Sequence, residues 1–187
     1  MKVVPLIILL VSSILSYSQN YSDRELDSLL AIQNKKTQSN KEIINTPFPL
    51  FSYVSNGDTI SNTSILGKTV FINFWFEGCP PCIAEFDALS EMHELLKNHK
   101  NTDFVTFTFE SNANIEKIRK KYNLEYKIIS IPRTECYRLN NNNGFPTSML
   151  IDKAGNISWI SSGGQLDKEK VKKFIIGYVY PKMLKML

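Results

Sequence analysis

Residues 69–86 read TVFINFWFEGCPPCIAEF, and within this stretch a strand pattern passes directly into a helix pattern. The first eight residues are nearly all apolar and rich in β-formers, which is typical of a central strand buried on both faces. From Pro80 onward, apolar residues recur at helical spacing and predict a helix that runs to about Lys97. Cys79 and Cys82 therefore fall at the carboxyl end of a buried strand, where sites gather in open α/β sheets.

The rest of the chain alternates between strand and helix patterns. Ahead of the buried strand, an alternating segment that turns at Asn56-Gly57 predicts a β-hairpin. After the first helix, the patterns predict a strand over 103–110, a helix capped by Asn112 or Asn114, and a strand over 126–131. An irregular or weakly helical segment over 134–144 follows. The chain then continues with a hairpin over 147–161 and a last helix capped by Asp167. This order predicts an α/β fold in which helices flank a central mixed β-sheet, with the N-terminal hairpin as an extension.

The N-terminus differs in composition from the rest. One Lys precedes an apolar run and then small polar residues, which predicts a secretory signal peptide over 1–18, cleaved after Ser18. The run is short for a membrane-spanning helix, and the alternative is an uncleaved inner-membrane anchor through residues 3–15. We expect an exported, periplasmic protein with a helical extension and linker over 19–46 and one domain over 47–187.

The composition is that of an ordinary globular protein. Apolar residues make up 43% of the 187 residues and charged residues make up 21%. Basic residues exceed acidic residues by only 22 to 18, and they are dispersed along amphipathic segments. We therefore expect no nucleic-acid partner.

Three cysteines are an odd number for an exported protein, so at least one has no partner within the chain. Cys79 and Cys82 enclose a loop too small to stabilise the fold, because the chain-entropy gain from a disulfide grows with loop length. A disulfide that stabilises little is better suited to being broken and re-formed. The spacing thus favours a redox pair over a structural cross-link.

Two prolines decide how the helix after Cys79 begins. With Cys79 as N-cap, Pro80 and Pro81 occupy the first two helical positions, where proline is tolerated. Neither proline has an amide hydrogen, so only the Cys82 N–H is left to bond the Cys79 sulfur. The helix dipole still favours a thiolate there, which predicts an exposed attacking thiol at Cys79 and a more buried resolving thiol at Cys82. Because the N–H groups of residues 80 and 81 are missing, the Cys79 thiolate should be less stabilised than in motifs that have both donors. We therefore expect a relatively reducing pair of cysteines.

Glu85 lies three residues after Cys82, on the same face of the predicted helix. A partly buried carboxylate with a raised pKa could accept the proton of Cys82, directly or through water. The alternative is that Glu85 only complements the positive end of the helix dipole.

A metal site is not expected in this chain. Zinc needs two ligands besides the two cysteines, and His93 and His99 both lie late in the same helix as Cys82. The third cysteine, Cys136, is interpreted as a free buried thiol. The alternative is a third redox cysteine, since Cys136 precedes Pro146 by about ten residues.

Together, VFINFWFEGCPPCIAEF and GFPTSMLIDKAGNI resemble the exported TlpA/ResA-like thiol-disulfide oxidoreductases of the thioredoxin-fold superfamily, from about Phe48 to Val179. The resemblance implies that Cys79 is the nucleophile, that Cys82 is the resolving thiol, and that the two form a redox disulfide. It also implies a catalytic role for Glu85, which matches an acidic residue beside the active site.

The same resemblance implies a substrate-binding set that comprises Trp75, Phe145, Pro146 and Thr147. Pro146 matches the cis-proline of the family, which packs against the CxxC motif, blocks metal binding and lets the Phe145 backbone pair with a substrate strand. One departure is Gly78, which replaces the aromatic residue usual before the first cysteine and predicts a more open site.

The implied function is an exported disulfide reductase that exchanges disulfides with protein substrates and receives electrons from an upstream membrane donor. No cofactor is expected, and a membrane tether is expected only if the signal peptide is not cleaved. One alternative is a peroxide-reducing relative, which Phe76 disfavours because such enzymes keep a hydroxyl residue three positions before the reactive cysteine. A second alternative is a non-catalytic exported binding module.

Overall fold

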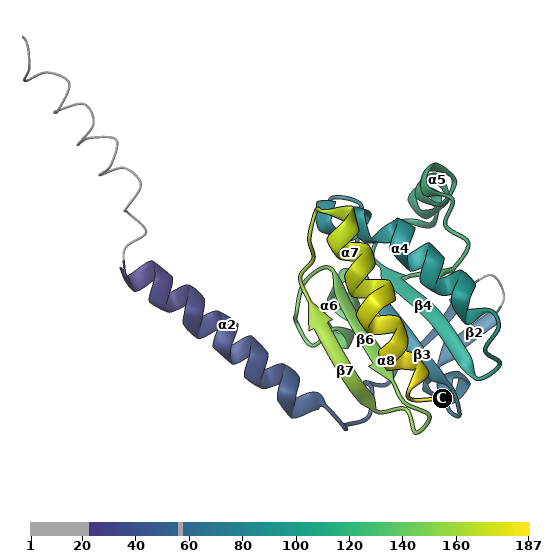
Figure 1. Cartoon of the computed structure of the whole chain (residues 1–187), viewed down its shortest axis with the longest axis horizontal. Helices are drawn as coiled ribbons and strands as arrows, with labels where there is room; N and C mark the ends of the chain where they lie inside the picture. The colour runs from purple at the N-terminus through teal and green to yellow at the C-terminus, as the bar shows by residue number, and fades with distance from the viewer. Residues whose placement is uncertain (1–22, 56–57) are drawn as a thin grey trace, which may run out of the picture. The chain divides into compact units, whose positions relative to one another are not determined.

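The computed structural model describes residues 23–55 and 58–187 of the chain (Figure 1). The chain divides after Ser39 into two units, and the compact unit Asn40–Leu187 contains the sheet and every predicted site residue. The predicted signal peptide, its cleavage point and the Asn56-Gly57 turn lie outside the described residues. Across the part of the chain that is described, no helix combines the length and apolar character needed to cross a membrane.

A five-stranded sheet with the order β5-β4-β3-β6-β7 forms the centre of the compact unit. Its strands are β3 (Thr69–Phe74), β4 (Thr102–Thr108), β5 (Lys127–Ser130), β6 (Thr147–Ile151) and β7 (Ile157–Ser162). Strands β3, β4 and β5 are parallel, whereas β6 is antiparallel to β3 and β7 is antiparallel to β6. All of β3 is buried in the middle of the sheet, as its unbroken apolar run predicts.

Helices cover both faces of the sheet, so each face has its own apolar core. One face carries α4 (Pro80–Leu96), α5 (Asn112–Tyr122) and α7 (Lys168–Phe174), which continues through a π-helical turn (Ile175–Val179) into α8 (Tyr180–Leu184). The other face carries α6 (Arg133–Leu139), the single turn α3 (Asn62–Ile65) and the hairpin of β1 (Ser52–Ser55) and β2 (Asp58–Ser61). The predicted mixed sheet with flanking helices and an N-terminal hairpin is thus confirmed.

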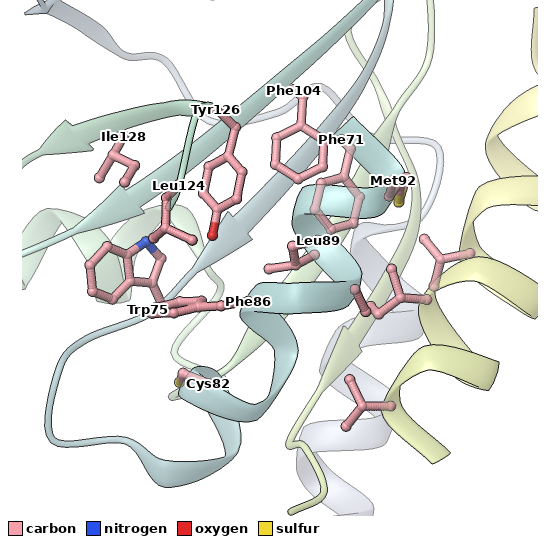
Figure 2. Close-up of a cluster of buried hydrophobic side chains, with 14 of the residues drawn as sticks. Phe71, Trp75, Cys82, Phe86, Leu89, Met92, Phe104, Leu124, Tyr126 and Ile128 are labelled. Carbon is pink, nitrogen blue, oxygen red and sulfur yellow. The ribbon is translucent and has the colours of Figure 1, made fainter. Parts of the chain in front are cut away.

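The alternation of β3 side chains decides what faces the start of α4. Phe71 and Trp75 point into the α4 core, where Figure 2 shows them with Phe86 and Leu89. Val70 and Ile72 belong to the opposite core. Asn73 lies on the same side of the strand as Phe71, and it is therefore directed toward α4.

Two local predictions need correction. Helix α2 spans Asp23–Ile43, so it continues through most of the predicted linker, which contains no Gly or Pro that would end a helix. The α5 helix is capped by Ser111, whose Oγ accepts from the Asn114 N–H at 3.2 Å, and neither Asn112 nor Asn114 is the cap. The helical alternative for the segment 134–144 is confirmed, because the short helix α6 covers its first half. The division of the chain at residue 46 remains a prediction.

Candidate active site

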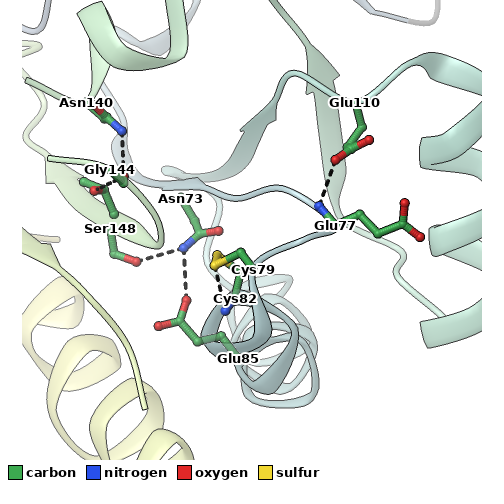
Figure 3. Close-up of a disulfide and its surroundings, with 10 residues drawn as sticks. Asn73, Glu77, Cys79, Cys82, Glu85, Glu110, Asn140, Gly144 and Ser148 are labelled. Carbon is green, nitrogen blue, oxygen red and sulfur yellow. Dashed lines mark hydrogen bonds between the residues drawn. A yellow bond between two sulfur atoms is a disulfide. The ribbon is translucent and has the colours of Figure 1, made fainter. Parts of the chain in front are cut away.

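The α4 helix begins at a disulfide between Cys79 and Cys82, with an S–S distance of 2.04 Å (Figure 3). Cys79 is the N-cap and Pro80 is the first helical residue, as the sequence predicts. The Cys82 N–H donates to the Cys79 Sγ over 3.3 Å. This is the one donor that the two prolines leave for the sulfur, so the predicted cap geometry is confirmed.

The prediction that Cys79 is exposed is wrong for this oxidised state. Cys79 is 5% exposed and Cys82 is 1% exposed, because the apolar core on the α4 face reaches the first turn of the helix. The order of accessibility nevertheless agrees with the predicted roles, since Cys79 is the less buried of the two residues.

The cis-proline and the loop after β7 adjoin the disulfide loop. The Phe145–Pro146 peptide bond is cis, as the resemblance implies. The Gly163 N–H donates to the Pro146 carbonyl at 2.9 Å. A Cβ on Gly164 would lie 2.9 Å from Pro146 Cγ and 3.0 Å from Pro81 Cβ. Gly164 thus packs against the CxxC motif and the cis-proline at once, and it is a site residue that sequence reasoning missed.

A Gly164→Ala substitution is expected to lower the free energy of unfolding by about 1–3 kcal/mol, the usual cost of overpacking. Both neighbours of the added methyl group are proline rings, which cannot move aside as a flexible side chain would. Urea unfolding of the oxidised protein measures the change. Gly177→Ala is the matched control, because its Cβ would lie 3.8 Å from Lys173 Cγ, an ordinary contact. Equal stability of Gly164→Ala and the control would contradict the packing described.

Glu85 is buried beside β3, where its only side-chain hydrogen-bond partner among the described residues is Asn73 (Figure 3). The Asn73 Nδ2 donates to Glu85 Oε2 at 3.3 Å and to Ser148 Oγ at 3.0 Å. The sequence placed Glu85 on the face of Cys82 but did not reveal that Asn73 is its partner. The pairing could have been found from the alternation of side-chain directions along β3, which directs Asn73 toward α4.

Burial raises the pKa of Glu85 to about 8, and the Asn73 hydrogen bond lowers it only in part. The predicted direction of this shift is confirmed, although Glu85 is more buried than expected, with 4% of its surface exposed. Glu85 lines a cavity of about 340 Å³ together with Val171, Phe174 and residues 161–165, which include the end of β7.

Two members of the predicted substrate-binding set are not at the surface. Trp75 is fully buried, and its Nε1 donates to Thr106 Oγ1 at 3.2 Å. Its prediction as a substrate contact is therefore corrected, because the indole fills the core behind the disulfide, edge-on to Phe86. Thr147 is also buried, and its Oγ1 donates to the Gly144 carbonyl at 2.8 Å. Phe145 is half-buried at the surface.

The opening predicted at Gly78 is occupied by an aromatic ring. A Cβ on Gly78 would lie 3.1 Å from Phe76 Cε2, so the Phe76 ring lies against the glycine. The Phe76 ring is 5.3 Å from the Phe109 ring and 5.3 Å from the Phe145 ring. These three half-buried rings form an apolar surface next to the cis-proline. The aromatic ring beside Gly78 is thus that of Phe76, two residues earlier in the chain.

Cys136 is a free, fully buried thiol, as predicted. Burial raises its pKa to about 12, so the thiol is not ionised at neutral pH. It lies in the core on the face of the sheet opposite to the disulfide, which argues against a third redox cysteine. Among residues 23–55 and 58–187, no group of three His, Cys, Asp or Glu side chains is placed to hold a metal ion.

Comparisons with known proteins agree with this geometry. A model of the AhpC/TSA family matches residues 44–160. The thiol-disulfide oxidoreductase ResA of Geobacillus kaustophilus is 28% identical over 109 residues, which make up 58% of this chain and 62% of that protein. The match thus spans less than two thirds of the curated relative.

Solved structures show the same fold. A thiol:disulfide interchange protein of the thioredoxin family from Chlorobium tepidum TLS is 27% identical, with a TM-score of 0.57 and coverage of 71% of this chain and 95% of that chain. A thiol:disulfide interchange protein from Bacteroides sp. is 21% identical, with a TM-score of 0.55 and coverage of 72% and 91%. The predicted thioredoxin-like fold is therefore confirmed.

Proposed function

The chain belongs to the AhpC/TSA family and has a thioredoxin fold, and on this premise we propose that it is a thiol-disulfide oxidoreductase that reduces disulfides in partner proteins. The observation that carries the proposal is the Cys79–Cys82 disulfide at the N-terminus of α4, beside the cis-proline Pro146. A pair that already closes a disulfide within one helical turn can cycle between dithiol and disulfide without rearrangement of the fold.

The reaction consists of two thiol-disulfide exchanges. In the reduced protein, the Cys79 thiolate attacks one sulfur of a substrate disulfide, and the other substrate sulfur leaves as a thiolate that takes up a proton. The Cys82 thiolate then attacks Cys79 Sγ, closes the Cys79–Cys82 disulfide and releases the second substrate thiol. Two electrons pass to the substrate in each cycle. A donor dithiol, proposed to be a membrane protein, must return them.

Glu85 has the properties of the group that accepts the Cys82 proton. It lies one helical turn beyond Cys82, and its pKa of about 8 is close to neutral pH, where proton transfer is most efficient. Glu85 also lines the cavity of about 340 Å³ beside the end of β7, which is the proposed route for its proton to solvent. In the reverse direction, neutral Glu85 can return the proton to Cys82 when the disulfide is reduced.

The Phe145 backbone provides a place for an extended substrate segment. Its N–H and carbonyl make no hydrogen bond to another described residue, so both are available to pair with a substrate strand. The apolar surface of Phe76, Phe109 and Phe145 adjoins this position and supports the binding of apolar side chains. Export to the periplasm is part of the same proposal, and it is supported by the signal-peptide pattern of residues 1–18.

Peroxide reduction is the less favoured activity. The residue three positions before Cys79 is Phe76, whose ring stacks on Phe109 and has no hydroxyl to hold a peroxide. A binding module without redox activity is disfavoured because it would have no use for two closely spaced cysteines at a helix N-terminus.

The reductive direction is tested by equilibrating the Cys79–Cys82 pair with glutathione. Because Pro80 and Pro81 supply no amide hydrogens, the Cys79 thiolate is weakly stabilised and the dithiol should be a good reductant. The expected midpoint lies nearer to about −270 mV than to about −120 mV. A midpoint near about −120 mV would assign the protein to disulfide formation. A cysteine pair that does not cycle between dithiol and disulfide would support the binding module.

A further inference from the structure

The four consecutive asparagines that precede the cis-proline make an ordered loop. Asn140 and Asn143 are almost fully buried, with 0% and 3% of their surfaces exposed. Asn141, Asn142 and Gly144 have φ angles of 56°, 55° and 78°, in the left-handed region that asparagine and glycine tolerate best. Buried amide side chains are retained in a surface loop only when they are hydrogen-bonded, so the partners of these amides are informative.

The two buried amides hold the loop and the peptide that follows it. The Asn143 N–H donates to Asn140 Oδ1 at 3.2 Å, and Asn143 Nδ2 donates to the Asn140 carbonyl at 2.9 Å. Asn140 Nδ2 then donates to the Gly144 carbonyl at 2.8 Å (Figure 3). Thr147 Oγ1 donates to the same carbonyl, also at 2.8 Å. The Gly144 carbonyl is therefore held by two donors.

Fixing that carbonyl fixes the direction of the Phe145 N–H. The Gly144–Phe145 peptide is planar, so its C=O and N–H point in opposite directions along one plane. A rotation that re-aimed the Phe145 N–H would break both hydrogen bonds to the Gly144 carbonyl. The N–H available to a substrate strand is thus oriented by side chains that do not themselves reach the substrate.

A residue distant in sequence completes this network. Asn40 lies in the last turn of α2, within the compact unit, and it is half-buried. Its Oδ1 accepts from Asn143 Nδ2 at 2.6 Å and from Asn141 Nδ2 at 3.2 Å, and its Nδ2 donates to Asn143 Oδ1 at 3.0 Å. Asn40 thereby holds Asn143, which holds Asn140, which holds the Gly144 carbonyl.

We propose that Asn40, Asn140 and Asn143 are positioning residues that hold the Phe145 backbone ready to pair with a protein substrate, which makes the last turn of α2 a part of the active site. This inference rests on the proposed oxidoreductase function. It assigns a role in catalysis to a residue outside the segment from Phe48 to Val179 that the sequence resemblance covers. None of the three asparagines takes part in the thiol chemistry itself.

The test is an Asn40→Ala variant of the full chain, assayed for reduction of insulin disulfides with dithiothreitol as electron donor. We expect the KM for insulin to rise about tenfold with little change in kcat, the scale of losing one to two net hydrogen bonds. The rate at which dithiothreitol alone reduces the Cys79–Cys82 disulfide should not change, because a small thiol does not pair with the Phe145 backbone. Exchange of the Phe145 amide hydrogen should become faster.

Two further variants separate positioning from general damage. Asn40→Asp keeps an oxygen for the Asn143 and Asn141 amides, so it should recover most of the affinity for insulin. Asn98→Ala removes an exposed asparagine just beyond the far end of α4 and should leave KM unchanged. Asn40→Ala should unfold cooperatively as the unchanged protein does, since Asn40 is only half-buried.

The outcomes distinguish this inference from the proposed function. An unchanged KM in Asn40→Ala, in a protein that reduces insulin, overturns the positioning role alone. The same holds if insulin and dithiothreitol reactions slow equally, because that result indicates a disturbed disulfide site. If the unchanged protein does not reduce insulin, the proposed function is overturned and the inference with it.

Discussion

Replacement of Cys79 by serine is expected to lower the reduction of a protein disulfide by about 10⁴-fold or more, as for the loss of other covalent nucleophiles. The serine hydroxyl is not ionised at neutral pH and cannot form a mixed disulfide. Cys82 cannot take over, because it is 1% exposed and lies one turn inside the helix. Insulin reduction with dithiothreitol as donor, measured above the uncatalysed background, gives the change directly.

Cys82→Ser is the informative companion to this variant. It retains the attacking thiol but cannot resolve the mixed disulfide, so the substrate should stay covalently attached through Cys79. Non-reducing electrophoresis or mass spectrometry of the intact adduct detects it. Cys136→Ser is the matched control and should keep full activity, because this thiol lies in the core on the other face of the sheet. Substrate trapped by Cys79→Ser instead of Cys82→Ser would reverse the assigned roles.

We expect the free energy of unfolding of the unchanged protein to fall as the pH rises. Glu85→Gln should remove much of this fall. Burial raises the pKa of Glu85 from 4.5 to about 8 in the folded protein. Because the folded-state pKa is the higher one, the stability linked to neutral Glu85 is fully present below pH 4.5 and is lost as the pH rises through about 8. The difference between the folded and unfolded pKa values corresponds to about 5 kcal/mol of unfolding free energy at most. Glutamine has no proton to lose, so it mimics the neutral acid at every pH.

Urea unfolding of both proteins at about pH 5 and about pH 9, with the disulfide intact, measures this effect. The free energy of unfolding should fall with pH by several kcal/mol more in the unchanged protein than in Glu85→Gln. Glu94→Gln on the same helix is a suitable control, because its side chain is exposed and 55% of its surface is accessible. Parallel pH profiles for the unchanged protein and Glu85→Gln would show that Glu85 does not titrate in this range.

The same substitution separates the two interpretations of Glu85. If the carboxylate accepts the proton of Cys82, Glu85→Gln should slow resolution of the mixed disulfide by about 10²-fold or more. Attack by Cys79 should be unaffected. If Glu85 only complements the helix dipole, both steps should keep their rates.

The chemistry at the start of α4 could be predicted from sequence because it is local. Cys79 as N-cap, the prolines in the first turn and the Cys82 N–H as sole donor to the sulfur all follow from four consecutive residues. The buried strand before them and the helix after them are likewise set by the spacing of neighbouring apolar residues. These features depend on backbone geometry within one turn, which the order of residues determines.

Contacts between distant segments were decided only by the tertiary structure. Trp75, which directly follows β3, is in the core and not at the substrate surface, since α4 covers the side of the sheet toward which the indole points. The extent of Glu85 burial, and hence the size of its pKa shift, depends on how closely α4 packs on the sheet. Local patterns cannot report such packing.

The clearest cases are pairs that are far apart in the chain. Gly164 meets Pro81 and Pro146 because the first turn of α4, the cis-proline loop and the loop after β7 come together in the folded chain. Asn40 meets Asn143 across 103 residues of sequence, and each amide taken alone has the appearance of a solvated loop or helix residue. The sequence by itself determined the pair of sulfurs at the start of α4 and the geometry of the helix cap around them. The surroundings that tune and orient them arise from burial and long-range hydrogen bonds, which exist only once the chain has folded.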